Sequence, residues 1–141
     1  MFVGYCLATL HVNVKVAVAI HTYNRAEYVK LCADALHGTV DTKDVGVFDD
    51  HSIDYSTSDL KKWFCTENIH RNEKRLKADG QARAVLEWFV KTDYDWLVTL
   101  DSDLIVRADW ISIFKKMIPK TQGVISLYHS GNIRNHPALK C

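Results

Sequence analysis

Glycine and proline are scarce in this chain, and that scarcity excludes the best-known phosphate-binding loops. The 141 residues include six glycines and two prolines. Neither a G-x-x-x-x-G-K-[ST] loop nor a G-x-G-x-x-G fingerprint occurs, and both need glycines that let the backbone approach a phosphate closely. A phosphate-containing ligand would therefore have to be held by a metal ion and basic side chains.

Paired cysteines, an excess of one charge and long apolar runs are absent as well. The four cysteines form no C-x-x-C pair and have no histidine at zinc spacing, so we expect free thiols and a cytoplasmic location. The 18 basic and 17 acidic residues leave a formal net charge of +1, which gives no reason to expect a nucleic-acid partner. No stretch is long enough for a transmembrane segment.

Residues 1–14 stand apart as an N-terminal extension. They are fairly apolar but lack the basic residues that begin a signal peptide. An added strand, a membrane-proximal segment and a non-native addition are all compatible with them, so a peripheral association with membranes stays open. The domain itself is expected to span residues 15–128, followed by an irregular tail at 129–141.

Short apolar runs alternate with helical patterns along this domain. Strands are expected at 15–20, 44–50, 68–71, 96–100 and 123–128, with a helix between each pair. This alternation predicts an α/β fold, with a mainly parallel, Rossmann-like sheet, right-handed crossovers and helices on both faces. In such sheets, ligands bind beyond the carboxyl ends of the strands.

Polar residues beside apolar stripes mark where the helices start. Caps are assigned to three helices, at Asn24 (with Glu27 in a capping box), at Ser58 or Asp59, and at Asp109. The clearest stripe follows a polar loop at 72–80 and consists of Ala82, Val85, Leu86, Phe89 and Val90. Cys32 falls on the stripe of the first helix and is expected to be a small buried apolar residue. Pro119 is expected to end the last helix.

Polar residues also follow three of the strands, at the edge where a ligand is expected. Thr22-Tyr23-Asn24 ends the first strand, Asp49-Asp50 ends the second, and Asp101 with Asp103 ends the fourth. In extended backbone, Asp101 and Asp103 project to the same side. Two carboxylates there suit a hard cation such as Mg²⁺ or Mn²⁺ and, through it, a diphosphate.

A second Asp-x-Asp sequence, Asp93-Tyr94-Asp95, precedes the fourth strand. With thirteen aspartates in the chain, about one such pair is expected by chance, so the motif alone carries little weight. This copy falls at the opposite edge of the predicted sheet, where we expect a solvated turn. The two Asp-x-Asp sequences are therefore distinguished by position, because one precedes the fourth strand and the other follows it.

Other side chains near the polar edge could contact a nucleotide. Asp50 can accept hydrogen bonds from a base N–H or a ribose hydroxyl, and the ring of Tyr23 can pack on a base. Arg83 could add positive charge, although it is equally compatible with a helix-surface cation near Asp79. The basic stretch 71–77 can likewise be a solvated loop or a loop that faces a diphosphate.

Four motifs occur in a fixed order along the chain: His-Thr-Tyr-Asn-Arg at 21–25, Asp-Asp-His-Ser at 49–52, Ala-Arg-Ala at 82–84 and Leu-Asp-Ser-Asp at 100–103. In this order and spacing they resemble the motifs of family 2 glycosyltransferases, which have the glycosyltransferase-A fold. His21 stands for that family's proline, His51 for its glycine and Ala84 for its asparagine. The resemblance covers roughly residues 15–128.

The resemblance implies a metal-dependent glycosyltransferase whose donor is a nucleotide-diphospho-sugar, such as a UDP- or GDP-sugar. The donor nucleotide would be bound by Thr22, Tyr23, Asn24, Asp50, Arg83 and Asp101. Asp101 and Asp103 would hold Mn²⁺ or Mg²⁺, which would neutralise charge on the departing diphosphate. The acceptor, whether glycan, lipid or protein, is not indicated.

The catalytic base is not evident, because no acidic residue follows Asp109. In the family, an Asp or Glu after the fifth strand usually deprotonates the acceptor hydroxyl. The alternatives are a truncated chain, a base role for His129 or His136, and a retaining mechanism that needs no such base. His129 could instead complete the metal shell.

Three other functions share parts of this pattern. A non-catalytic nucleotide-sugar-binding module would keep the donor residues without turnover. A haloacid dehalogenase-type phosphohydrolase has a similar Leu-Asp-Ser-Asp motif, but on its first strand and with a downstream lysine and acidic pair. A sugar-nucleotide pyrophosphorylase would need a glycine-rich opening loop, which is absent.

Overall fold

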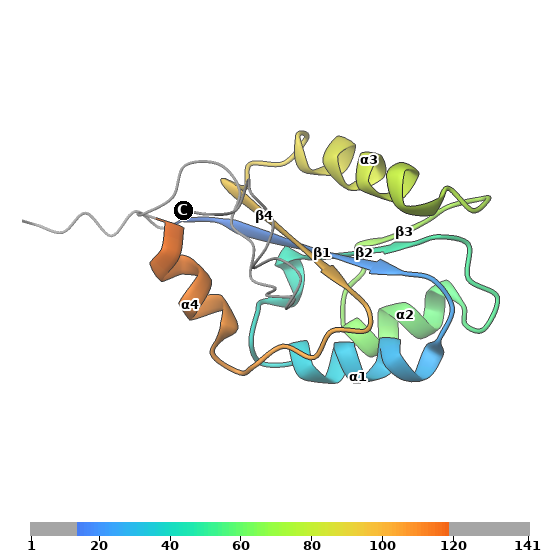
Figure 1. The fold of residues 1–141 in the computed structure, drawn as a ribbon, viewed down its shortest axis with the longest axis horizontal. Coiled ribbons are helices and arrows are strands. Elements are labelled where there is room, and N and C mark those ends of the chain that lie inside the picture. Colours follow the sequence, from blue (N-terminus) through green and yellow to red (C-terminus); the bar gives the residue numbers. More distant parts are fainter. Residues whose placement is uncertain (1–13, 119–141) are drawn as a thin grey trace, which may run out of the picture.

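Four parallel strands form the centre of the fold, with helices on both faces (Figure 1). The computed structural model describes residues 14–118, and within them the sheet has the order β3-β2-β1-β4. The strands are β1 (Val16–Thr22), β2 (Val45–Asp49), β3 (Ile69–Arg71) and β4 (Trp96–Asp101). All their pairings are parallel, so the predicted parallel α/β fold is confirmed.

The apolar runs form strands because both faces of the central strands are covered. Every residue of β2 is buried, and so is every residue of β1 except His21. Parallel strands covered on both faces are built from near-continuous apolar sequence. β4 forms an edge of the described sheet and is less covered, since its Thr99 is exposed.

The helices are divided unequally between the two faces of the sheet (Figure 1). On one face lie α1 (Ala26–Leu36), α2 (Thr57–Phe64) and α4 (Trp110–Met117), and on the other lies α3 (Lys77–Phe89). A 3₁₀ turn, η1 (Thr42–Asp44), leads into β2. The two faces therefore bury different amounts of apolar surface.

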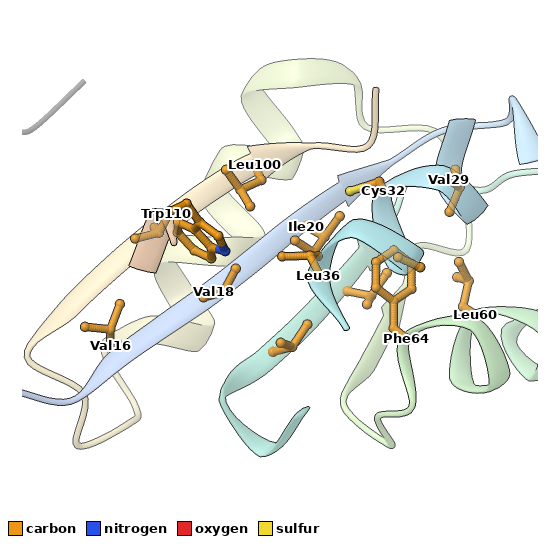
Figure 2. Packing of buried hydrophobic residues seen from close by; sticks show 14 of the residues in the cluster. Val16, Val18, Ile20, Val29, Cys32, Leu36, Leu60, Phe64, Leu100 and Trp110 are labelled. Carbon is orange, nitrogen blue, oxygen red and sulfur yellow. The ribbon is translucent and has the colours of Figure 1, made fainter. Parts of the chain in front are cut away.

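The larger core lies between the sheet and helices α1, α2 and α4 (Figure 2). Alternate residues of β1 meet side chains of all three helices there, including Val16, Val18, Ile20, Cys32, Leu36, Leu60, Phe64 and Trp110. Cys32 is a buried free thiol, as predicted, and burial raises its pKa to about 11. The smaller core, under α3, contains Ala19, Phe48 and Val85.

The start of α1 differs from the prediction. Its N-cap is Arg25, and no side chain caps the helix. The predicted capping box of Asn24 and Glu27 is therefore wrong. Asn24 instead uses its side-chain oxygen to accept a hydrogen bond from the Ile53 N–H at 2.9 Å. A contact with the loop after β2 has replaced the local cap.

The capping atoms of α2 and α4 also differ from the prediction. α2 is capped by Ser56, not by Ser58 or Asp59, and Asp59 accepts a hydrogen bond from the Ser56 N–H to complete a capping box. Asp109 does hold the N-cap position of α4, but its carboxylate pairs with Arg107 and caps nothing. The helix positions thus follow the sequence pattern more closely than the capping contacts do.

Helix α3 begins at Lys77, inside the segment 72–80 that the sequence predicts as a loop. Its predicted apolar stripe is only partly buried. Val85 is 1% exposed, whereas Leu86 and Val90 are 55% and 74% exposed. The helix is therefore rotated relative to the pattern of its apolar residues.

Two tertiary contacts account for that rotation. The Gln81 side-chain amide donates a hydrogen bond to the Phe48 carbonyl at 3.1 Å, which turns a polar residue inward. The Trp88 ring packs edge-on against the Phe48 ring, with centroids 5.4 Å apart. Both contacts depend on β2, so the stripe within α3 could not reveal them.

Several predictions lie outside the described residues. They concern the N-terminal extension up to residue 13, the helix end at Pro119, the strand at 123–128, and the tail with His129 and His136. Within residues 14–118, no helix is both long enough and apolar enough to cross a membrane.

Candidate functional site

The polar ends of β1, β2 and β4 meet at one edge of the sheet, as predicted. Thr22 is level with Asp49 in the β1–β2 pairing, and His21 is level with Asp101 in the β1–β4 pairing. Arg71 of β3 is level with Asp49 on the other side. We call this edge the carboxyl rim and define it as residues 21–25, 49–55, 71–77 and 101–103.

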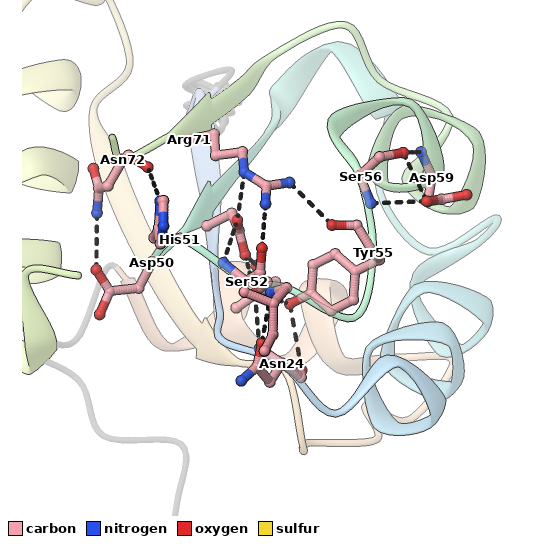
Figure 3. A network of polar contacts seen from close by, with 12 residues as sticks. Asn24, Asp50, His51, Ser52, Tyr55, Ser56, Asp59, Arg71 and Asn72 are labelled. Atoms are coloured by element: carbon pink, nitrogen blue, oxygen red, sulfur yellow. Dashed lines mark hydrogen bonds and ion pairs between the residues drawn. The ribbon is translucent and has the colours of Figure 1, made fainter. Parts of the chain in front are cut away.

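Beneath the rim, Asp49 is fully buried and anchors a polar network (Figure 3). Its carboxylate accepts hydrogen bonds from the Thr22 hydroxyl at 2.9 Å, from the Ser52 N–H at 3.1 Å and from the Ser52 hydroxyl. A buried charge is tolerated when it is paired and hydrogen-bonded in this way. The Thr22 side chain is itself buried, so its hydroxyl supports the rim from within rather than facing solvent.

Arg71 completes this network from β3 (Figure 3). Its Nε lies 3.4 Å from the Asp49 carboxylate, and its other nitrogens donate hydrogen bonds to the carbonyls of Ser52 and Tyr55. The flat guanidinium has enough donors to satisfy all three partners at once. Arg71, the first of the basic residues at 71–77, is therefore a structural link between β3 and the loop after β2.

Asp50 is almost completely buried and both of its oxygens have partners. One oxygen accepts hydrogen bonds from the Asn72 side chain at 3.1 Å and from the Leu76 N–H at 2.6 Å. The other accepts from the Lys77 N–H at 2.9 Å. The backbone of Leu76 is in the right-handed helical conformation and that of Lys77 has a positive φ of 60°. Successive backbone N–H groups in that arrangement form a concavity that binds anions. Asp50 thus caps α3 from outside the helix.

Arg75 links Asp50 to Tyr23. Its guanidinium carbon lies 4.0 Å from the centre of the Tyr23 ring, and its Nε lies 3.8 Å from an Asp50 oxygen. The two side chains that the sequence assigns to a nucleotide base are therefore neighbours on the rim. The arginine that joins them was not singled out by the sequence, beyond its membership of the basic stretch.

The turn between β1 and α1 has unusual backbone. Asn24 and Arg25 both adopt the left-handed conformation, with φ of 50° and 59°. This conformation costs a non-glycine residue about 1 kcal/mol or more. At the end of the turn, the Arg25 Nη1 lies 3.5 Å from the Asp103 carboxylate, and both side chains are largely exposed.

Asp101 and Asp103 are brought to the rim, but not by continuous extended backbone. β4 ends at Asp101, and a hydrogen bond of 3.1 Å from the Leu104 N–H to the Asp101 carbonyl closes a turn there. The expectation that strand geometry aligns the two carboxylates is therefore wrong. Asp101 lies beside His21 and Asp103 beside Arg25. Burial lowers the pKa of His21, and the Asp101 carboxylate opposes that shift.

The chemistry of these donors fits a divalent cation. Both carboxylates are exposed, and the Arg25 guanidinium lies 3.5 Å from the Asp103 carboxylate. Mg²⁺ usually takes one or two protein carboxylates and completes its shell with water and substrate phosphates. In residues 14–118, no group of three or more His, Cys, Asp or Glu side chains is arranged to hold a metal.

Arg83 lies apart from the rim residues. It projects into solvent from α3, with 80% of its side chain exposed, and pairs with Glu87 one turn along at 2.7 Å. The predicted neighbour, Asp79, is not its partner in the structure. The basic side chains that do lie beside rim carboxylates are Arg25, Arg71 and Arg75.

The second Asp-x-Asp sequence lies at the opposite edge of the sheet, as predicted. Asp93 pairs with the Lys15 side chain, and the Asp95 carboxylate accepts a hydrogen bond from the Lys15 N–H at 2.9 Å. Lys15 immediately precedes β1, at the amino end of the strands. These two carboxylates therefore close a structural turn far from the rim.

A parallel sheet with helices on both faces and carboxylates at the ends of its strands defines a Rossmann-like α/β domain. The family profile described as Glycosyl transferase family 2 matches residues 17–136. The chain belongs to this glycosyltransferase family, which confirms the resemblance seen in the motifs. A search of curated proteins gives no match.

The position of the Leu-Asp-Ser-Asp motif in the sheet bears on the phosphohydrolase alternative. The motif ends β4, with three other strands before it in the described part of the chain, whereas a haloacid dehalogenase-type phosphohydrolase carries it on its first strand. The phosphohydrolase interpretation therefore has no support from the strand order.

Proposed function

We propose that this domain binds a nucleotide-diphospho-sugar, such as a UDP- or GDP-sugar, together with Mn²⁺ or Mg²⁺, and transfers the sugar to an acceptor hydroxyl. The observation that carries the proposal is the grouping of Tyr23, Asp50, Asp101 and Asp103 on the carboxyl rim of a chain from this family. Parallel α/β sheets bind their ligands at this edge.

The base and ribose would lie over β1 and β2. Tyr23 offers a partly exposed ring for stacking. Asp50 would accept hydrogen bonds from base N–H groups once the segment 72–77, which now bonds both of its oxygens, releases one of them. Because Arg75 now occupies the space between Tyr23 and Asp50, it would have to move or stack with the base. Asn24 would contribute through its side-chain NH₂ group, since its side-chain oxygen is bonded to Ile53 and its backbone N–H to Ser52.

The diphosphate would lie beyond β4, where Asp101 would face the ribose and the cation and Asp103 would bind the cation. A bound Mn²⁺ or Mg²⁺ supplies Lewis acidity, which lowers the charge on the departing diphosphate. Arg83 would contribute only after leaving Glu87 and turning toward the rim. Arg25, which already touches Asp103, is the better-placed cation.

Transfer requires the acceptor oxygen to bond to the anomeric carbon while the bond from that carbon to the diphosphate oxygen breaks. The acceptor proton must go to a base in an inverting reaction. His129 and His136 remain the proposed candidates for that role, and both lie outside the described residues.

A non-catalytic nucleotide-sugar-binding module is the second candidate. The observation that favours it is the lack of an evident catalytic base, since no Asp or Glu follows Asp109 in the sequence. A donor hydrolysis or transfer assay distinguishes the two, because a module would bind the donor without turnover.

The decisive experiment compares Asp103→Asn with Asp93→Asn, a matched change in the other Asp-x-Asp sequence. Thermal shifts with UDP, GDP and their sugars would be recorded with and without Mn²⁺, since ligand binding raises the melting temperature by mass action. The wild type and Asp93→Asn should show thermal shifts with the nucleotides that depend on Mn²⁺. Asp103→Asn should bind the nucleotides in the presence of Mn²⁺ at least about tenfold more weakly than the wild type. Undiminished binding by Asp103→Asn would contradict the proposed site.

A further inference from the structure

Arg25 occupies a position that local backbone chemistry does not favour for arginine. It is the N-cap of α1, where Ser, Thr, Asp and Asn are preferred, and its side chain makes no cap contact. Its left-handed backbone favours Gly and Asn. Its positive charge lies at the helix end that stabilises negative charge. An explanation for this residue must therefore come from elsewhere in the molecule.

The turn that carries Arg25 is firmly held by the loop after β2. The Asn24 N–H donates to the Ser52 hydroxyl at 2.7 Å, and the Arg25 N–H donates to the Asp54 carboxylate at 2.7 Å. The Tyr55 hydroxyl donates to the Asn24 carbonyl at 3.3 Å (Figure 3). Strained backbone that is fixed by its surroundings is typical of functional positions.

The result of this arrangement is the contact between Arg25 and Asp103. Nη1 and the carboxylate oxygen are 3.5 Å apart, and the side chains are 67% and 50% exposed. An exposed ion pair of this kind is weak and easily exchanged. A guanidinium also matches the geometry of phosphate oxygens, so Arg25 has an alternative partner once a diphosphate arrives.

We propose that Arg25 couples cation binding to diphosphate binding. Without nucleotide, Arg25 pairs with Asp103 and opposes a divalent cation at that carboxylate. With a nucleoside diphosphate present, Arg25 transfers to the phosphate oxygens and leaves Asp103 to the cation. The inference rests on the proposed function and deepens it, because it makes the metal site complete only when the donor is bound.

The test measures Mn²⁺ affinity by electron paramagnetic resonance for the wild type, Arg25→Gln and Arg107→Gln, each with and without UDP or GDP. Arg107→Gln is the matched control, because Arg107 forms a similar exposed pair with Asp109 outside the rim. In Arg25→Gln, the affinity for Mn²⁺ alone should rise by up to about fivefold. The gain in Mn²⁺ affinity on adding the diphosphate should shrink, since coupling is reciprocal between the two ligands.

Two failures are distinguishable. If the wild type binds neither Mn²⁺ nor a nucleoside diphosphate, the proposed function is wrong. If the wild type binds both and Arg25→Gln keeps the same gain as the wild type, the coupling role of Arg25 is wrong while the proposed function stands. Should Arg25→Gln fail to fold, Arg25→Lys keeps the charge without the guanidinium fork. The gain should then be intermediate, and an unchanged gain would overturn the inference.

Discussion

At the scale of single residues, the neighbouring aspartates at the end of β2, Asp49 and Asp50, have different surroundings. Asp49 is enclosed by Thr22, Ser52 and Arg71, whereas Asp50 accepts a hydrogen bond from a backbone N–H at the N-terminus of α3. The first therefore stabilises the sheet edge from inside. The second pairs with Arg75, whose guanidinium lies over the Tyr23 ring on the rim.

Replacing Asp49 by alanine should destabilise the domain by about 3 kcal/mol, because it leaves Arg71 and two hydroxyl groups without their buried acceptor. The free energy of unfolding in urea measures the loss. Asp93→Ala is the control, since Asp93 is exposed and should leave the free energy of unfolding unchanged within error. Equal stability of the two variants would show that the network contributes little.

At the scale of elements, the caps show how tertiary contacts replace local signals. The sequence predicts Ser58 or Asp59 as the cap of α2, but Ser56 fills that role through its hydrogen bonds with Asp59. Asn24, a favourable cap for α1, is bound to the loop after β2.

Ser56→Ala should lower the free energy of unfolding by about 1 kcal/mol, because the first turn of α2 loses a hydrogen-bond acceptor. Ser58→Ala should have no comparable effect, since Ser58 is exposed within the helix and alanine has the higher helix propensity. Urea denaturation of both variants provides the comparison. A larger loss in Ser58→Ala would mean that α2 begins later than the structure indicates.

The strand β3 contributes a pH-dependent contact. His70 stacks on the Phe48 ring, with centroids 4.5 Å apart, and burial lowers its pKa. Its neutral form is therefore favoured in the folded state, so its contribution to stability is present above about pH 6.5 and is lost as pH falls through the folded pKa. Burial acts on the pKa of His21 in the same direction.

His70→Phe should retain the stacking without titrating. Its free energy of unfolding should fall less than that of the wild type between pH 7.5 and pH 5.5, as measured by urea denaturation at each pH. Parallel losses in the two proteins would assign the pH dependence to other groups.

The strands could be predicted because their apolar runs are the direct signature of a sheet covered on both faces. The helix α3 could be located but not oriented, because Gln81 and Trp88 are turned inward by contacts with Phe48. In the site, the meeting of the polar strand ends at one edge of the sheet could be predicted from parallel topology alone. The contacts of Arg25 and Arg75 could not be predicted, since their partners lie just after other strands and no local pattern links them.

At the scale of the whole molecule, the two faces of the sheet differ in how firmly they are covered. α1, α2 and α4 share one large apolar cluster, whereas α3 is the one helix within residues 14–118 on its face and has few fully buried apolar side chains. The capping of α3 also depends on Asp50, which lies in the loop after β2.

Amide hydrogens of α3 should therefore exchange faster than those of α1, because a helix with fewer buried apolar contacts opens at a lower free energy. Hydrogen–deuterium exchange with peptide-level mass spectrometry measures both helices in one sample. Asp50→Asn should accelerate exchange in α3 more than in α1. Equal protection of the two helices in the wild type would contradict the expected difference.

The strand order also has a consequence for synthesis on the ribosome. β1 lies between β2 and β4, and β4 is made last of the three. A nascent chain that has not reached Trp96 can pair β1 with β2 but leaves the other edge of β1 open. It also lacks both carboxylates of the Asp101–Asp103 turn. Exposed strand edges promote association between chains, so chaperones would be needed most just before Asp101 and Asp103 emerge.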